Sequence, residues 1–464
     1  MDNILVFLFL LTSVIWFFYI LSLENTDIFK FAFWITFMNM FIGHAFFRFY
    51  VIDLHSLGYE MYLMWLGELL YYYLLIRIVH RKKYRKFFLR LNLFTIILAV
   101  IFISTVLNFQ SVIYSFLSLR VLYIYLLFCY IIYVYTFKDK TYEKFFRLFL
   151  FLAIINSIFS ILQYLTMDTL GFSAQMTGGI FGYHGTGTGA LFSVIQSCLC
   201  LHIYIRKRKM IYLFLAVFIA IPMITGFAYA GFGFLVVSIL FVFFQYLKKL
   251  HFKYILLSFS VGSIILFSLY QIELKRVSID DWVGGYNKSK SSPIAIYKNW
   301  DVFMETVIYN PDQIQSGYGF GRIGAVIFGF ESMIEDFSTF FIGHGPGSIT
   351  YSGYTMGYVN PMEEVRAIGV ALLTLMYELG FWGPLLLIFT FFVLYKKWKK
   401  TIRPDFGLSQ YYFDNMGVLL LVYFLSTMYT SLLNNFFLIF FFAIQLSYMH
   451  SLYKSQTLTV KKVR

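Results

Sequence analysis

Residues 186–209 read TGTGALFSVIQSCLCLHIYIRKRK, an uncharged run of about 20 residues that ends in four consecutive basic residues. An α-helix needs about 20 mostly apolar residues to cross the hydrocarbon core of a bilayer. A second apolar run, residues 211–226, begins directly after the basic group. Because basic residues gather in the cytoplasmic loops of membrane proteins, this stretch predicts two membrane-spanning helices joined on the cytoplasmic side.

The same pattern extends over most of the chain. Its 464 residues are 60% hydrophobic and 22% aromatic, and only 13% are charged, which is about half the charged fraction of a soluble globular domain. A single hydrophobic core stops growing when a domain reaches about 250–300 residues, so the apolar runs of this chain cannot form one soluble core. The sequence therefore predicts an all-α polytopic membrane protein with about 12–14 transmembrane helices. Thirteen spans are expected near residues 3–22, 29–50, 58–79, 91–108, 114–137, 147–166, 186–205, 211–226, 229–247, 254–270, 367–395, 414–432 and 435–453.

The charge distribution predicts the topology. The chain has 37 basic and 23 acidic residues, a net charge of +14. The basic residues cluster between spans, at residues 81–90, 206–209, 248–253 and 396–403, and in the C-terminal tail. These loops and the C-terminus are expected in the cytoplasm, so the excess charge does not indicate a nucleic-acid partner. Residues 3–22 lack a basic n-region and a cleavage site, and we interpret them as a retained span rather than a signal peptide.

One long segment, residues 271–366, separates the tenth and eleventh predicted spans. It has eleven acidic and seven basic residues, a net charge of −4, and it lies on the side opposite the basic loops. Apolar periodicity predicts helices at residues 294–308 and 324–337, and structureless loops of this length are uncommon. The segment is therefore predicted to be an external, partly helical cap on a single membrane domain, residues 1–464.

The strongest local motif in the cap is GHGPGS at residues 343–348. Its glycines and proline forbid a helix and expose backbone N–H groups, so Gly345 and Gly347 are candidate contacts for a charged or sugar ligand. A plain tight turn uses the same residues. His344 is a candidate proton carrier because the ordinary pKa of histidine is about 6.5, although an exposed loop histidine is the simpler interpretation.

Two further candidates come from other parts of the chain. A second glycine-rich stretch, residues 178–189, contains His184 and lies just before a span on the outer side. It either shapes a substrate cleft or only begins the helix, with Thr186 or Thr188 as the cap. Arg120 lies near the outer end of its span, where it either reaches a lipid phosphate or joins the cleft.

The charged residues of the cap suggest a diphosphate site. An external enzyme without nucleotide needs a substrate that carries its own leaving group, and arginine binds diphosphate with a planar fork. Arg276, Arg322 and Arg366 are the candidates, with structural ion pairs as the alternative. Glu363 and Glu364 are candidate bases at the membrane edge, or caps of the following helix. Without histidine or a third carboxylate at ligand spacing, no metal site is expected.

Five segments of the chain form an ordered set: GIFGYH at 179–184, ITG at 224–226, Arg322, GHGPGS at 343–348 and YELGFWG at 377–383. Their order and spacing resemble the O-antigen polymerase and O-antigen ligase superfamily over about residues 175–395. In that family an arginine precedes a glycine-rich turn in the large external loop, as Arg322 does here. A helix with the pattern Glu-x-Gly-x-x-Gly follows, as Glu378, Gly380 and Gly383 do.

Two departures favour a polymerase over a ligase. Ligase-like members often carry His-Asn before the glutamate, where this chain has Gly369-Val370, and Ser-Arg after Thr-Gly, where it has Phe227-Ala228-Tyr229. The resemblance implies polymerisation of undecaprenyl-diphosphate-linked repeat units into O-antigen, capsule or exopolysaccharide at the outer face of the bacterial cytoplasmic membrane. It implies a lipid-linked glycan donor and acceptor, a chain-length regulator as a further partner, and neither metal nor cofactor.

Three alternatives stay open. A ligase would transfer the glycan to another acceptor, and a flippase would only move the same lipid-linked units. Flippases have mostly short loops, so the folded cap favours an enzyme. Another type of lipid-dependent glycosyltransferase places paired acids in its first external loop, and residues 23–27 are too short for such a loop.

Overall fold

The computed structural model describes residues 93–108, 139–170, 179–181, 186–225, 229–246, 322–346, 371–402, 404, 407–427 and 436–463. Every regular element in these ranges is an α-helix or a short 3-10 helix, and none is a strand. Two of the helices contain segments long and apolar enough to cross a membrane, Asp139–Gln163 and Gly187–Lys207. The all-helical prediction is confirmed for these residues, while the number of spans and the sidedness of the loops stay predictions.

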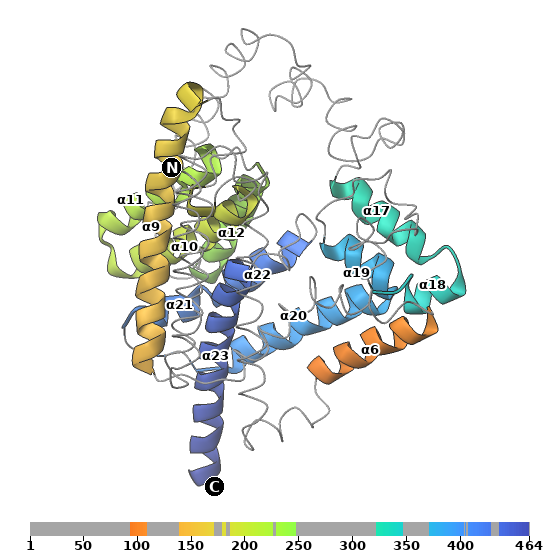
Figure 1. The fold of residues 1–464 in the computed structure, drawn as a ribbon. Helices are drawn as coiled ribbons and strands as arrows, with labels where there is room; N and C mark the ends of the chain where they lie inside the picture. The colour runs from red at the N-terminus through yellow and green to blue at the C-terminus, as the bar shows by residue number, and fades with distance from the viewer. Residues whose placement is uncertain are drawn as a thin grey trace, which may run out of the picture.

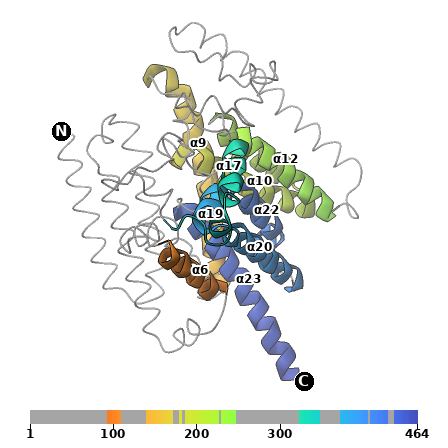
Figure 2. The same cartoon turned by 90° about the vertical axis from the view of Figure 1, so that its right-hand side faces the viewer.

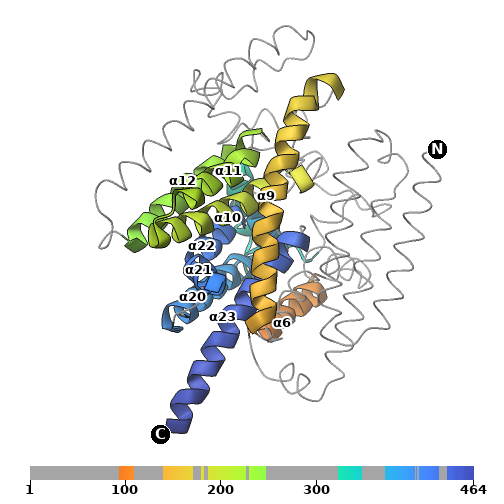
Figure 3. The same ribbon diagram turned by 90° about the vertical axis from the view of Figure 1, so that its left-hand side faces the viewer.

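A helical bundle around α10 forms one half of the described molecule (Figures 1 and 3). Of the apolar window of α10 (Thr186–Lys207), 94% is buried, whereas only 44% of the corresponding window of α9 is buried. α10 is therefore enclosed by other helices, and α9 keeps an open apolar face. The surrounding helices are α9 (Asp139–Leu170), α11 (Met210–Thr225), α12 (Tyr229–Tyr246), α21 (Gly407–Asp414), α22 (Met416–Thr427) and α23 (Phe436–Val463).

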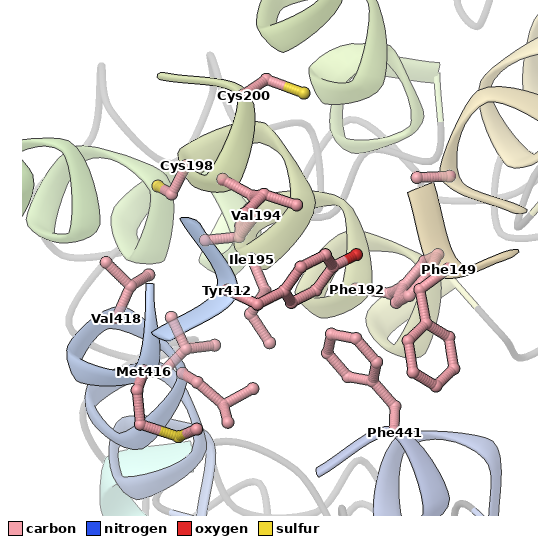
Figure 4. Packing of buried hydrophobic residues seen from close by; sticks show 14 of the residues in the cluster. Phe149, Phe192, Val194, Ile195, Cys198, Cys200, Tyr412, Met416, Val418 and Phe441 are labelled. Atoms are coloured by element: carbon pink, nitrogen blue, oxygen red, sulfur yellow. The ribbon is translucent and has the colours of Figure 1, made fainter. Parts of the chain in front are cut away.

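Aromatic side chains from several helices fill the centre of this bundle (Figure 4). The ring of Phe441 on α23 makes edge contacts with Phe149 of α9 and Phe192 of α10, at centroid distances of 4.7 and 5.2 Å. The Tyr412 hydroxyl, on α21, donates to the side-chain oxygen of Gln196 at 2.9 Å. Edge contacts and a satisfied hydroxyl are the usual ways to bury aromatic residues, and here they hold four helices together.

A smaller helical unit lies beside the bundle in Figure 1 and faces the viewer in Figure 2. α17 packs along α19, and their shared core contains Met333, Leu372, Leu373 and Met376. The close approach depends on Gly329, where an added Cβ atom would lie 2.7 Å from Cδ1 of Leu373. α20 contacts α22 and α23, which joins this unit to the bundle. Its helices are α6 (Leu93–Leu107), α17 (Arg322–Met333), α18 (Phe337–Ile342), α19 (Ala371–Leu379) and α20 (Trp382–Lys400).

Several predicted spans agree with the helices. The spans predicted at 186–205, 211–226 and 229–247 correspond to α10, α11 and α12 with small shifts at their ends. The predicted helix 324–337 is instead divided between two helices. α17 ends at Met333, and Asp336 is the N-cap residue of α18, which begins at Phe337. The other predicted cap helix and five spans lie outside the described residues: 294–308, 3–22, 29–50, 58–79, 114–137 and 254–270.

The prediction of one continuous span at 367–395 is wrong. The chain forms α19 and α20 there, separated by Gly380 and Phe381. Gly380 has a φ of 59°, a left-handed conformation that interrupts a right-handed helix and that favours glycine. The break brings the end of α19 against α18, which is the arrangement that builds the candidate site.

Candidate functional site

The glycine-rich turn of the cap lies on the C-terminal end of α19. The backbone N–H of His344 donates to the carbonyl of Tyr377 at 2.8 Å, and that of Gly345 donates to the carbonyl of Glu378 at 3.1 Å. Gly343 and Gly345 have φ values of 65° and 94°. A Cβ atom on Gly343 would lie 2.5 Å from the carbonyl carbon of Glu378. The turn therefore needs glycine both for its conformation and for its close approach to α19.

The glycines of the Glu-x-Gly-x-x-Gly pattern form the other side of this contact. The N–H of Phe381 donates to the carbonyl of Phe340 at 2.8 Å. A Cβ atom on Gly380 would lie 2.6 Å from that same carbonyl oxygen, and one on Gly383 would collide with the carbonyl group of Leu375. The two motifs, far apart in sequence, are thus one hydrogen-bonded unit.

Ser104 of α6 completes the unit, and the sequence analysis missed it. Its hydroxyl lies 2.6 Å from the carbonyl of Ile342 and 3.3 Å from that of Glu378. The side-chain amide of Asn108, one turn later, donates to the Ser104 carbonyl at 2.9 Å. A serine in an apolar run carries no signal of such a contact, because small polar residues are common in membrane helices.

The ring of His344 stacks on Tyr377, with a centroid distance of 4.1 Å and an interplanar angle of 23°. Partial burial lowers the pKa of His344 below 6.5, whereas the negative charge of Glu335, a hydrogen bond with the Ser332 backbone and the charge of Asp336 raise it. Burial is the largest of these effects, so the ring is neutral at pH 7. A neutral imidazole near carboxylates is able to accept a proton.

The rim beside His344 is acidic. Glu331, Glu335 and Asp336 are exposed, and no lysine or arginine side chain is described between residues 323 and 346. Asp336 caps α18 by accepting hydrogen bonds from the N–H groups of Ser338 and Thr339 at 2.6 and 2.8 Å. Hydrogen bonds from the Ser338 side chain and the Thr339 backbone lower the pKa of Asp336. A rim of this charge does not by itself attract an anionic ligand.

Arg322 lies at the opposite end of α17 from His344. It is the first residue of the helix, and its side chain is outside the described part. The ring of His344 interacts with Ser332, ten residues further along α17. At 1.5 Å per residue, this corresponds to about 15 Å along the helix axis. The two predicted site residues are therefore not next to one another.

Glu378 is fully buried, with 0% of its surface exposed. Its backbone carbonyl accepts hydrogen bonds from the N–H of Gly345 and from the Ser104 hydroxyl. The remaining predicted site residues lie outside the described part of the chain: Arg276, Arg366, Glu363, Glu364, Gly347, His184 and Arg120. Their roles stay predictions.

The second glycine-rich stretch has a structural role at its beginning. The 3-10 helix η5 (Gly179–Phe181) docks on α9. Gln163 accepts a hydrogen bond from the N–H of Gly179 at 2.7 Å and donates to its carbonyl at 3.0 Å, and Asn156 accepts from the N–H of Ile180 at 3.0 Å. Three hydrogen bonds clamp the segment, and α10 begins at Thr186, so Thr188 lies inside the helix and not at its cap.

Among the residues that the structure describes, no three His, Cys, Asp or Glu side chains are grouped to hold a metal ion. Comparison with protein-family models, curated proteins and solved structures finds no match to this chain.

Proposed function

We propose that this chain is a polytopic glycosyltransferase of the bacterial cytoplasmic membrane that polymerises undecaprenyl-diphosphate-linked repeat units. It works without metal or cofactor on the outer face, and its product is a surface polysaccharide. The observation that carries the proposal is the joining of the GHGPGS turn to the Glu-x-Gly-x-x-Gly helix by the hydrogen bonds of His344, Gly345 and Phe381. These are two of the motifs that carry the family resemblance, and their direct contact supports one shared site.

Glycan transfer breaks the bond between the anomeric carbon and the diphosphate of the donor. The electron pair leaves with the diphosphate, and the acceptor hydroxyl loses a proton to a base as its oxygen bonds to the anomeric carbon. A general base must lie within about 3 Å of that hydroxyl, and the cation that stabilises the diphosphate lies on the other side of the same carbon. Because Arg322 begins α17 about 15 Å along its axis from Ser332, the residue next to His344, we propose that the two side chains do not act together on one bond.

This separation leaves two assignments. In the first, Arg322 binds the leaving diphosphate, Glu363 or Glu364 is the base, and His344 contacts the acceptor glycan. In the second, His344 is the base, and Arg276 or Arg366 binds the diphosphate. We favour the first assignment, because the first turn of an α-helix has free N–H groups that attract phosphate, and Arg322 begins α17.

The test is a polymerisation assay with the purified full chain in lipid vesicles and defined undecaprenyl-diphosphate repeat units. A polymerase produces a ladder of glycans that differ by one repeat unit. A ligase transfers a glycan once to another acceptor, and a flippase moves the lipid across the bilayer without forming a new bond. If the folded full chain in vesicles forms no ladder from these repeat units, the proposed function is rejected.

The membrane topology has its own test. Cysteine is introduced at Ser289, in the cap, or at Ser455, an exposed residue of α23, and intact cells are treated with a membrane-impermeant thiol reagent. The predicted topology gives labelling at residue 289 in intact cells and labelling at residue 455 only after the cells are opened. Labelling only at residue 455 in intact cells would reverse the topology.

A further inference from the structure

α17 and α18 share an exposed apolar surface, which we call the aromatic ridge. Ile327 and Phe330 lie three residues apart on α17, and Phe337 and Phe341 lie four apart on α18, so each pair follows one side of its own helix. Ile334 lies in the turn between the two helices. The rings of Phe337 and Phe341 contact each other at a centroid distance of 4.8 Å, and Phe337 is 81% exposed. The ridge consists of Ile327, Phe330, Ile334, Phe337 and Phe341.

The ridge lies beside the ends of two other apolar helices. α18 contacts α6, where the Ser104 hydroxyl bonds to the carbonyl of Ile342 (Figure 1). On the other side, the ring of Phe340 stacks on Phe381 at 5.4 Å, directly before α20. Both neighbouring helices have exposed apolar faces, with Phe102, Ile103, Val106 and Leu107 on α6 and Trp382, Leu385, Ile388, Phe389, Phe392 and Val393 on α20. The ridge therefore continues their open apolar surface.

The charges of α20 indicate which membrane surface the ridge faces. α20 ends in Lys396, Lys397, Lys399 and Lys400, and the ridge is near its other end, at Trp382. Basic residues mark the cytoplasmic side, so the ridge lies at the outer interface. Aromatic side chains are enriched at this level of membrane proteins, where hydrocarbon meets headgroups.

We propose that the aromatic ridge docks into the outer leaflet of the lipid bilayer, with Phe337 and Phe341 at the boundary between headgroups and acyl chains. The exposed acids Glu331, Glu335 and Asp336 beside the ridge oppose anionic headgroups. The surface therefore takes apolar chains and uncharged or zwitterionic headgroups. α18 leads directly into Gly343 and the His344 turn, so docking holds that turn next to the membrane surface, whatever reaction the site performs.

The test measures the depth of single fluorophores in the full-length protein. In a background with Cys129, Cys198 and Cys200 replaced by alanine, one cysteine carries an environment-sensitive dye in nanodiscs of zwitterionic lipid. Phe337→Cys and Phe341→Cys probe the ridge, and both residues are exposed enough to tolerate the change. Phe102→Cys, 68% exposed on α6, is the lipid reference. Ser455→Cys, exposed on α23, is the water reference.

The proposal predicts blue-shifted emission at residues 337 and 341, quenching by lipids labelled near the headgroup, and iodide quenching several-fold weaker than at residue 455. Iodide quenching equal to that at residue 455 would place the ridge in water and overturn the proposal. Protection from both iodide and lipid quenchers would mean that protein covers the ridge, which also overturns it. Added anionic lipid should not strengthen these signals, because the acids beside the ridge oppose anionic headgroups. If the signals instead require anionic lipid and disappear at high salt, charge recognition and not apolar docking holds the ridge, which overturns the proposal.

Discussion

Replacing Gly380 by alanine should detach the glycine-rich turn from α19. Gly380 has a φ of 59°, and the added Cβ atom would lie 2.6 Å from the Phe340 carbonyl oxygen, 2.7 Å from that of Thr339 and 2.8 Å from the Gly343 nitrogen. All three are backbone atoms, so no side-chain rotation relieves the collision. Either α18 shifts away from α19, or the backbone at Gly380 leaves its left-handed conformation.

The cost of the substitution follows from these contacts. An L-residue with a side chain pays about 1–2 kcal/mol for the left-handed conformation. Moving α18 also weakens the hydrogen bond between Phe381 and Phe340, which adds about 1 kcal/mol. The docked arrangement should therefore lose about 2–3 kcal/mol. Because about 1.4 kcal/mol corresponds to a factor of ten, the undocked population should rise by about 30- to 150-fold.

Amide hydrogen exchange on the purified protein measures this opening. The amides of His344 and Gly345, which donate to α19, should exchange faster by about that factor, while those of α10 should be unchanged. Gly233→Ala is the matched control, since its position in α12 has no atom within 4 Å of the added Cβ, and alanine should stabilise the helix by about 1 kcal/mol. Wild-type exchange at residues 344 and 345 in Gly380→Ala would refute the reasoning.

Four further predictions concern single side chains. Arg322→Ala should reduce the polymerisation rate by about 100-fold or more in a well-expressed protein, and Arg322→Lys should recover only part of it; a normal rate in the alanine variant would remove Arg322 from the site. Burial lowers the pKa of His344, so the folded protein should lose stability as the pH falls below 6.5, and His344→Gln should remove that loss in urea unfolding at several pH values. Since Glu335 raises that pKa, Glu335→Gln should lower it further, so the loss should still begin near the ordinary pKa of about 6.5 but extend to lower pH and become larger; a smaller loss would contradict this. Glu143 accepts hydrogen bonds from the N–H groups of Leu408 and Ser409 and from the Ser409 hydroxyl at the start of α21. Glu143→Ala should therefore destabilise the bundle by about 1–2 kcal/mol in thermal unfolding, whereas Lys144→Ala, at an exposed neighbouring position, should have little effect.

The sequence alone determined where the apolar helices lie. The predicted runs at 186–205, 211–226 and 229–247 match α10, α11 and α12 closely. This succeeds because a run of about 20 apolar residues is a local property, and backbone groups in such a run are satisfied best by helical hydrogen bonds. The turn at Gly343 was also predictable, since closely spaced glycines and proline do not continue a helix.

Only the tertiary structure decided what these local elements do together. Ser104 lies 238 residues from Ile342 and 274 residues from Glu378, and a pattern in a short window holds no information on such pairings. Nothing in the apolar run 367–395 marks Gly380 as a break, because glycine is tolerated inside membrane helices. Its left-handed conformation is imposed by the packing of α18 against α19, where backbone approaches backbone too closely for any side chain.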